Sequence, residues 1–173
     1  MTRTKNTLEG ATGRALVWAF RAEMAVAIAC LAIMAAVVLA DVIGRELVGQ
    51  GIEGAQKLAV YAFVYAGFLG LPLTTAQGDH LRPRLFDALS ARHLSPAALA
   101  RMQHLPAALL SFGMAWTGIS FVAESIGFNE RSPSLDIPVW WVQMVVPWAF
   151  ASSGLRHLIF ALVPSLAPAG GAS

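Results

Sequence analysis

The chain has 173 residues, of which 57% are hydrophobic and only 13% are charged, against about 25% charged residues in a typical soluble domain. Its net charge of +2 is too small to indicate a nucleic-acid-binding protein, and its Lys and Arg residues do not gather in one patch. The single cysteine, Cys30, excludes a disulfide within one copy and argues against a zinc site built on cysteines.

The N-terminal residues 1–20 are basic and carry Thr, Asn and Gly between the charges. We expect them to form a cytosolic tail that passes into an interfacial helix, because four large apolar residues near its end can lie on the membrane. These residues are Leu16, Val17, Trp18 and Phe20. Arg21 and Glu23 follow and are placed to pair at the membrane edge.

The first membrane span is predicted at residues 24–40. Alanines recur there at steps of three or four and predict a small-residue face, which would let another helix approach closely. They are Ala25, Ala29, Ala32, Ala36 and Ala40. An alternative is a signal peptide cleaved after Ala40, but its apolar run of about 17 residues is longer than the usual 7–15. We therefore favour a span that is retained.

A second span is predicted at residues 55–76. No charged residue lies between Leu58 and Ala76, a stretch of about 19 residues that covers the roughly 30 Å core of a bilayer at helical rise. Pro72 is expected to kink this helix near its exit, and Leu69 is expected to face lipid. A ridge of small residues again recurs at steps of three or four. It consists of Ala59, Ala62, Ala66, Gly70 and Thr74.

Residues 77–104 form a basic loop that contains Arg82, Arg84, Arg92 and Arg101. Within it, four apolar residues have the spacing of a short helix that lies in the membrane interface. They are Leu81, Leu85, Phe86 and Leu89. Ser95-Pro96 is typical of the first turn of a helix, which leads into a third span at 105–123.

The fourth span is predicted at residues 137–157, with Trp140 and Trp141 at its entrance and Pro147 inside it. The tail at 164–173 is rich in Pro, Ala and Gly, and we expect it to be disordered.

Lysine and arginine residues are unevenly distributed between the two sides of these spans. The loops at 41–54 and 124–137 carry one each, Arg45 and Arg131, whereas most others lie in the N-terminal tail and in loop 77–104. The positive-inside rule then places both termini and loop 77–104 in the cytosol. The sequence therefore predicts an all-α integral membrane protein with four transmembrane helices and both termini cytosolic, in one membrane domain over residues 1–173.

Ionisable residues lie close to the predicted membrane edges, whereas an enzyme or a proton-coupled carrier would be expected to place such groups inside a span. His80, His104 and His157 lie at the cytosolic ends of spans, and two of them could flank a haem or a metal ion. No two of them share one helix at a spacing of four. We predict that the chain is not an enzyme and holds no cofactor or metal of its own.

Three sets of motifs, in this order, resemble the small membrane subunit of the tripartite ATP-independent periplasmic (TRAP) transporters, the DctQ-like family. The first set is Asp41-Val42-Ile43-Gly44-Arg45. The second set is Gly67-Phe68-Leu69-Gly70 followed by Gly78-Asp79-His80-Leu81. The third set is Ile137-Pro138-Val139-Trp140, Val146-Pro147 and Leu155-Arg156. The resemblance covers about residues 24–163, but Gly54 and Gln56-Lys57 stand where the family often has a tryptophan and paired glutamates.

This resemblance implies a division of labour in the bacterial inner membrane. A separate large membrane subunit would carry an organic acid and sodium, and a soluble periplasmic protein would capture the substrate. This chain would brace the large subunit, contact membrane lipid and help to receive the loaded binding protein. The candidate partner contacts are Arg45, Gly70, Glu130, Arg131, Asp136, Trp140 and Trp141.

Three other functions stay open at this point. The small subunit of the related tripartite tricarboxylate transporters also has four spans. A membrane redox protein would hold a haem between His104 and either His157 or His80. A homo-oligomeric channel would assemble through the alanine and glycine faces, but the sequence lacks a polar stripe to line its pore.

Overall fold

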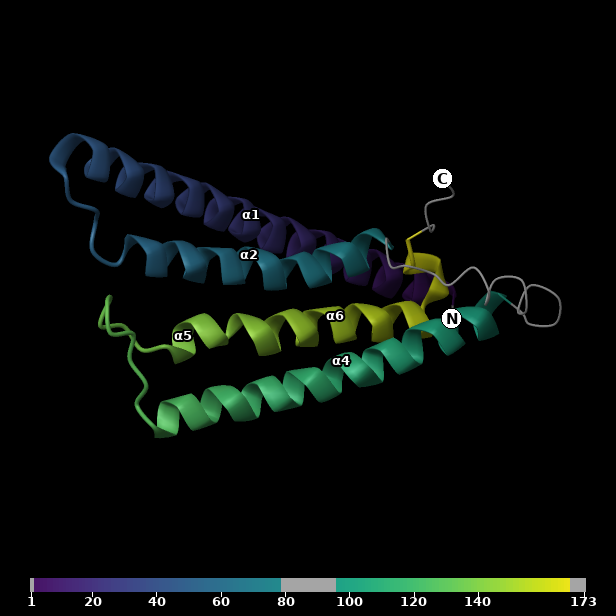
Figure 1. Ribbon diagram of the computed structural model, residues 1–173. Helices are drawn as coiled ribbons and strands as arrows, with labels where there is room; N and C mark the ends of the chain where they lie inside the picture. Colours follow the sequence, from purple (N-terminus) through teal and green to yellow (C-terminus); the bar gives the residue numbers. More distant parts are fainter. Residues whose placement is uncertain (1, 79–95, 169–173) are drawn as a thin grey trace.

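The computed structural model describes residues 2–78 and 96–168. Within these ranges, four helical segments are long and apolar enough to cross a membrane. They are α1 (Thr2–Val48), α2 (Ala55–Gln77), α4 (Pro96–Gly127), and the consecutive helices α5 (Trp140–Gln143) and α6 (Val145–Leu162). A short 3-10 helix, η1 (Pro164–Leu166), follows α6. The chain is thus an all-α membrane protein with four spans, which confirms the predicted fold class (Figure 1).

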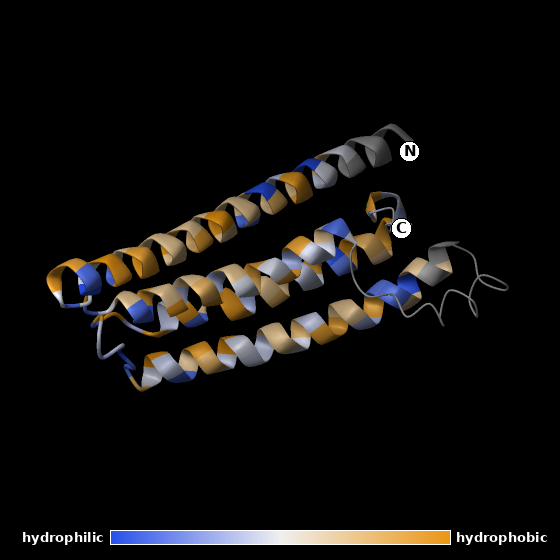
Figure 2. Cartoon of the chain, turned by 45° about the horizontal axis from the view of Figure 1, so that its top comes forward, coloured by the Kyte–Doolittle hydropathy of each residue, from blue (hydrophilic) through white to orange (hydrophobic). Residues whose placement is uncertain are grey.

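The spans lie side by side in a row, in the order α1, α2, α6 and α4, and do not close into a bundle (Figure 1). The helix α1 packs along α2, α2 packs against α6, and α6 packs most extensively against α4. We call the end of the row that holds the start of α1 and the end of α6 the inner end, and the opposite end the outer end. Hydrophobic residues cover most of each helix, and hydrophilic residues gather towards the two ends (Figure 2).

The buried side of α1 is a narrow stripe along α2. Buried and half-buried residues recur there at alternating steps of three and four, a period near 3.5 that suits two helices wound around each other. Along the span they are Glu23, Ala27, Cys30, Met34, Val37, Asp41 and Gly44. The predicted alanine face from Ala25 to Ala40 lies on the other side of the helix and is exposed. Alanines occur on several sides of α1, and the two carboxylates that must be shielded from lipid decide which side packs.

The start of α1 differs from the prediction of a separate interfacial helix at residues 1–20. The helix runs without a break from Thr2 to Val48, over 47 residues, because no proline interrupts it. The interfacial helix predicted around residues 81–89 lies outside the described residues. The helix start at Pro96 is confirmed, as proline favours the first position of a helix.

Glycine ends the helix of the second span, and proline interrupts the helix of the fourth span. The helix α2 ends at Gly78, which has φ of 76° and donates its N–H to the Thr74 carbonyl at 3.1 Å. Pro147 explains the break between α5 and α6, because its ring clashes with the carbonyl four residues earlier, at Gln143, where α5 ends. The last helix continues to Leu162, beyond the predicted end at 157.

The tail predicted to be disordered at 164–173 begins with the ordered turn η1 instead. Its first residue, Pro164, has the fixed φ that suits the start of a helical turn, and the N–H of Ala167 donates to the Pro164 carbonyl at 3.2 Å. Residues 169–173 lie outside the described part of the chain.

The tightest helix contact is between α4 and α6. A Cβ at Gly118 would lie 3.2 Å from the Pro147 nitrogen, and a Cβ at Gly154 would lie 3.2 Å from the ring of Phe112. Glycine therefore allows the two helices to approach each other closely, as is common in membranes.

Candidate functional site

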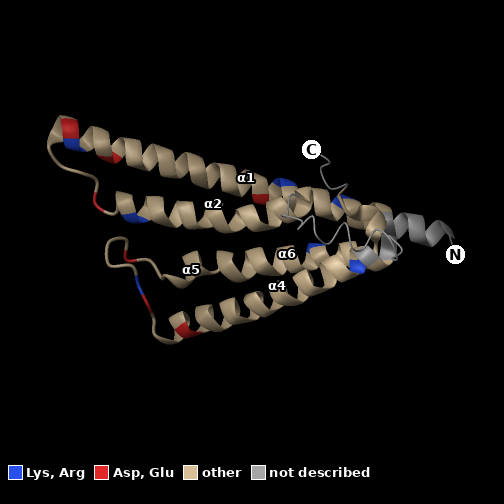
Figure 3. Cartoon of the chain, turned by 45° about the vertical axis from the view of Figure 1, so that its right-hand side comes forward, with Lys and Arg blue, Asp and Glu red and all other residues tan. Residues whose placement is uncertain are grey.

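Charged side chains of the described residues gather at the two ends of the helix row (Figure 3). On α1, the buried carboxylates Glu23 and Asp41 lie near the inner and the outer end of the row. They are about 27 Å apart at helical rise, which is close to the roughly 30 Å thickness of a bilayer core. The outer end holds most of the predicted partner contacts, and the inner end holds a polar cluster.

The first outer loop, residues 49–54, is held by Asp41. This side chain is 8% exposed, and it accepts hydrogen bonds from Arg45 Nη2 at 2.7 Å and from the Ile52 N–H at 2.8 Å. A Cβ at Gly51 would lie 2.7 Å from Asp41 Oδ1, so only glycine lets the loop approach the carboxylate this closely. The Arg45 side chain stays 53% exposed, and its guanidinium is therefore fixed at the outer surface and accessible there.

The second outer loop, residues 128–139, is closed by contacts of its own. Arg131 donates from Nε to Asp136 Oδ1 at 2.8 Å and from Nη2 to the Asp136 carbonyl at 2.6 Å. Asp136 has φ of 50°, in the left-handed region that turns the chain back. Glu130 accepts a hydrogen bond from Ser125 Oγ at 2.8 Å. Two predicted contacts, Arg131 and Asp136, are therefore bonded to each other.

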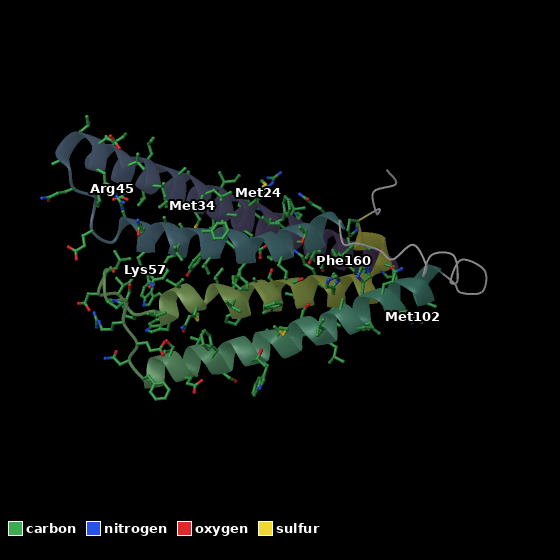
Figure 4. The ribbon with its side chains drawn as sticks, viewed as in Figure 1. Met24, Met34, Arg45, Lys57, Met102 and Phe160 are labelled. Carbon is green, nitrogen blue, oxygen red and sulfur yellow. The ribbon has the colours of Figure 1, made fainter. Side chains whose placement is uncertain are left out.

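The two outer loops meet at a cleft of about 550 Å³. Arg45 and Lys57 line it at the outer end of the molecule (Figure 4), and Ser134 contributes from the second loop. A Cβ at Gly54 would lie 2.6 Å from Leu135 Cδ2, so the second loop packs directly on the first. We call these two packed loops the outer surface.

Trp140 and Trp141 open the fourth span beside this outer surface, as predicted. Their ring centroids are 5.3 Å apart, and the Trp141 carbonyl accepts a hydrogen bond from the Tyr65 hydroxyl at 2.5 Å. The Trp141 side chain is 61% exposed, whereas Trp140 is half-buried. The hydrogen bond thus ties the entrance of the fourth span to α2, while the Trp141 ring remains available for contact.

Gly70 lies on α2, away from the outer surface. A Cβ at this position would meet no atom within 4 Å, so a side chain added there would point into open space between the described residues. The neighbouring Leu69 does not face lipid as predicted, because it is 4% exposed and packs with Ala27 and Val145. The helix α2 lies between α1 and α6 and needs two packed sides, which a single ridge of small residues does not supply.

The inner end contains a buried polar cluster that joins the first span to the last. Arg156 donates from Nη2 to Glu23 Oε2 at 2.7 Å and from Nη1 to the Ser152 hydroxyl at 2.6 Å. Ser152 donates in turn to Glu23 Oε1 at 2.5 Å. The predicted pairing of Glu23 with Arg21 is wrong, because residues two apart project from different sides of a helix.

Two further contacts extend the cluster to the other spans. Thr75 on α2 and Ser153 on α6 share a hydrogen bond of 2.7 Å. The Nδ1 atoms of His104 on α4 and His157 on α6 lie 3.1 Å apart, so one imidazole donates and the other accepts. All four spans therefore meet in polar contacts at the inner end.

The sequence pattern placed Glu23 and Arg156 at a membrane edge but did not reveal that they form a pair. A usable signal was present, because the two opposite charges lie at the same predicted membrane level on different spans, and such groups tend to pair with each other. The order of the helices across the row decides which spans meet, and it is not encoded in the periodicity of any one helix.

The histidine contact also bears on the redox alternative. The rings of His104 and His157 hydrogen-bond directly, with centroids 5.3 Å apart, which leaves no space for a porphyrin between them. Among the described residues, no three His, Cys, Asp or Glu side chains gather as a metal site. His80 lies outside that part of the chain, so the expectation that no cofactor is held stays a prediction.

Comparison with known protein families matches residues 34–164 to the DctQ component of the tripartite ATP-independent periplasmic transporters. A known relative is the ectoine TRAP transporter small permease protein TeaB of Halomonas elongata, which is 24% identical over 131 residues. The aligned region covers 75% of this chain and 67% of that relative.

The family match extends from the middle of α1 to the start of η1. It includes both outer loops and the polar cluster at the inner end, except for Glu23, which precedes the matched residues. A transporter subunit of this family is not an enzyme, and the match sets aside the tricarboxylate-transporter alternative. The chain belongs to the DctQ family and is a small permease subunit of a TRAP transporter.

Proposed function

We propose that this subunit braces the large membrane subunit of its transporter and offers its outer surface to the substrate-loaded periplasmic binding protein. The complex would lie in the bacterial inner membrane and import an organic acid together with sodium. The sodium would bind to the large subunit. The observation that carries the docking role is the pair of packed outer loops. They hold charged and aromatic side chains in fixed positions at the end of the molecule opposite the start of α1.

The charge of the outer surface supports docking. The two loops and the helix ends beside them hold six acidic and three basic residues, namely Asp41, Glu46, Glu53, Glu124, Glu130, Asp136, Arg45, Lys57 and Arg131. Both arginines are paired with acids, whereas Glu46, Glu53 and Glu124 form no ion pair with a described residue. The remaining negative charge would steer a partner of complementary charge and raise its association rate more than its residence time.

The row of helices supports the bracing role. Because α1 lies at one edge and packs along α2, its alanine face from Ala25 to Ala40 is left exposed. Gly70 on α2 is likewise open within the described residues. Small residues on an open face let a helix of another subunit approach closely, so these positions suit a contact with the large subunit.

The docking role is tested by reversing charges that make no structural contact. In a Glu53→Lys, Glu124→Lys variant we expect the transporter's binding protein to associate with the membrane complex several-fold more slowly at low ionic strength. The defect should shrink as salt is raised, because the screening length falls to about 3 Å at 1 M. Stopped-flow or surface-plasmon measurements give the rate, and co-purification of the two membrane subunits shows that the complex is intact.

Arg101→Glu is the matched control, since it reverses an exposed charge at the inner end and should leave association unchanged. Glu130 and Asp136 are poorer test positions, because each accepts a hydrogen bond within the outer surface. Equal rates for the wild type and the Glu53→Lys, Glu124→Lys variant at every ionic strength would assign docking to the large subunit.

A further inference from the structure

We propose that the inner end of the subunit carries a binding site for an anionic phospholipid. An acyl chain would fill an apolar cavity between α1, α2 and α6, and an oxygen of the glycerol ester or phosphate would accept a hydrogen bond from Arg156 Nε. The exposed arginines Arg14 and Arg21 would favour a negatively charged head group.

The cavity has a volume of about 350 Å³, within the range of about 300–1,000 Å³ that is typical of ligand pockets. Its walls are mainly apolar and come from α1, α2, α6 and η1. They include Leu16, Val17, Phe20, Phe160 and Leu166, and Phe160 is labelled at this end of the row in Figure 4. Among the described residues that line the cavity, Arg156 is the one that carries a charge.

One nitrogen of the Arg156 guanidinium, Nε, makes no hydrogen bond with a described residue. The guanidinium carries five N–H donors, and Nη1 and Nη2 donate to Ser152 and Glu23. Nε is buried and has no acceptor among the described residues, although the side chain is only 2% exposed. A buried donor without a partner is costly and calls for an acceptor, which a ligand in the adjoining cavity would supply.

The charge around the cavity favours an anion. Glu23 is already bound to Arg156, so the buried pair is close to neutral. Arg14 and Arg21 are exposed, form no ion pair with a described residue, and project from the same flank of α1 because seven residues make about two helical turns. Basic pockets between membrane helices on the cytoplasmic side bind anionic head groups.

The combination of walls and charges identifies the occupant as a lipid rather than a free phosphate. A soluble anion could satisfy Arg156 Nε and the two exposed arginines, but it would leave the apolar walls against water. The cavity extends from the level of Arg156 and Glu23, where the apolar stretch of α1 begins, to Gly13, about 15 Å further towards the inner end at helical rise. A molecule with an oxygen-bearing head and an apolar tail fits both the chemistry and this level.

The test uses the full-length subunit purified with its large subunit and then delipidated. Phosphatidylglycerol or phosphatidylcholine is added, and native mass spectrometry measures the lipid that is retained. Gly13→Phe places a ring in the cavity, since a Cβ at Gly13 meets only Leu166 Cδ2, at 3.6 Å. Gly10→Phe is the matched control one turn earlier, where a Cβ meets nothing within 4 Å.

We expect the wild type and Gly10→Phe to retain phosphatidylglycerol at least tenfold more strongly than phosphatidylcholine, and Gly13→Phe to lose this retention. A second variant, Arg14→Gln with Arg21→Gln, leaves the cavity intact and should lose the preference for phosphatidylglycerol alone. Equal retention by wild type and Gly13→Phe would overturn the site. Protection of the complex against heat by glycerol 1-phosphate, to the same extent as by phosphatidylglycerol, would show a soluble-anion site and overturn the role of the acyl chain.

Discussion

The ion pairs at the two ends of the first span differ in their surroundings and therefore in what they contribute. The side chains of Arg156 and Glu23 are 2% and 4% exposed, whereas in the outer pair Asp41 is buried and Arg45 is exposed. The pair of Arg131 and Asp136 is exposed on both sides, at 47% and 85%. Exposed pairs typically contribute about 0–1 kcal/mol to stability. Removing one partner of a buried pair costs about 3–5 kcal/mol, because the other charge is left uncompensated.

We therefore expect Glu23→Leu and Arg156→Leu each to lower the free energy of unfolding by about 3–5 kcal/mol. The double variant should lose much less than the sum, since no buried charge remains. Unfolding of the purified subunit in mixed micelles measures the three values. Arg131→Leu is the control at the exposed pair with Asp136, with an expected loss of about 1 kcal/mol or less. Additive losses in the double variant would show that the two charges do not compensate each other.

Single residues could be placed on the correct side of the membrane from the sequence, but their partners could not. Arg131 and Asp136 were both predicted as contacts in the second outer loop, yet their mutual bond depends on the left-handed turn at Asp136. Glu23 was assigned to its neighbour Arg21 because periodicity reports only on one helix at a time. The ionic partner of Glu23 lies on the last span, and only the order of helices across the row brings it near.

Among the helices, the glycines divide into those that pack inside the subunit and those that face outwards. Gly118→Ala should lower the free energy of unfolding by about 1–3 kcal/mol, because the new Cβ would press on the Pro147 backbone.

Gly70→Leu should leave the stability of the subunit unchanged and weaken its co-purification with the large subunit, since the new side chain would block the open face of α2 at Gly70. Thermal unfolding and affinity capture of the large subunit measure the two effects.

Gly113→Ala is the control on the same helix as Gly118. It adds a Cβ to open space, and alanine favours a helix over glycine by about 1 kcal/mol, so the variant should be as stable as the wild type or more so. Loss of stability in Gly113→Ala to the same extent as in Gly118→Ala would refute the close approach of α4 and α6. Full capture of the large subunit by Gly70→Leu would remove Gly70 from the interface.

Helix boundaries were predicted well where a residue enforces them and poorly elsewhere. The ends at Gly78 and Pro96 follow from the left-handed glycine and from proline at a first turn. No such residue divides α1, and the predicted interfacial helix is part of one continuous segment. The side of α1 that packs could not be chosen from its alanines, because the need to shield Glu23 and Asp41 outweighs small-residue spacing.

For the molecule as a whole, the arrangement of spans places the two outer loops on one side of the membrane and the start of α1 on the other (Figure 1). In a Cys30→Ala background, we expect cysteines at Glu53 and Ser134 to react with an impermeant maleimide in intact cells. A cysteine at Arg101 should react only after the membrane is opened. All three positions are exposed, so accessibility reports the side of the membrane.

Lysed cells provide the control for reactivity, since all three cysteines should then be labelled. Labelling of the Arg101 position in intact cells, with no labelling at Glu53 and Ser134, would reverse the orientation derived from the basic residues. It would also move the outer surface to the cytosol and end its proposed role in receiving a periplasmic protein.

The pairing of Glu23 with Arg156 also orders the biosynthesis of the subunit. The two residues are 133 positions apart, so the ribosome releases the carboxyl group into the membrane long before its counter-ion exists. During that interval the hairpin of α1 and α2 must keep Glu23 at the aqueous edge, because a lone carboxylate among apolar side chains is costly. Insertion of α6 supplies Arg156, and Glu23 can then be buried beside it. A nascent chain that stops before α6 retains a pair of α1 and α2 whose carboxylate has no counter-ion on the last span.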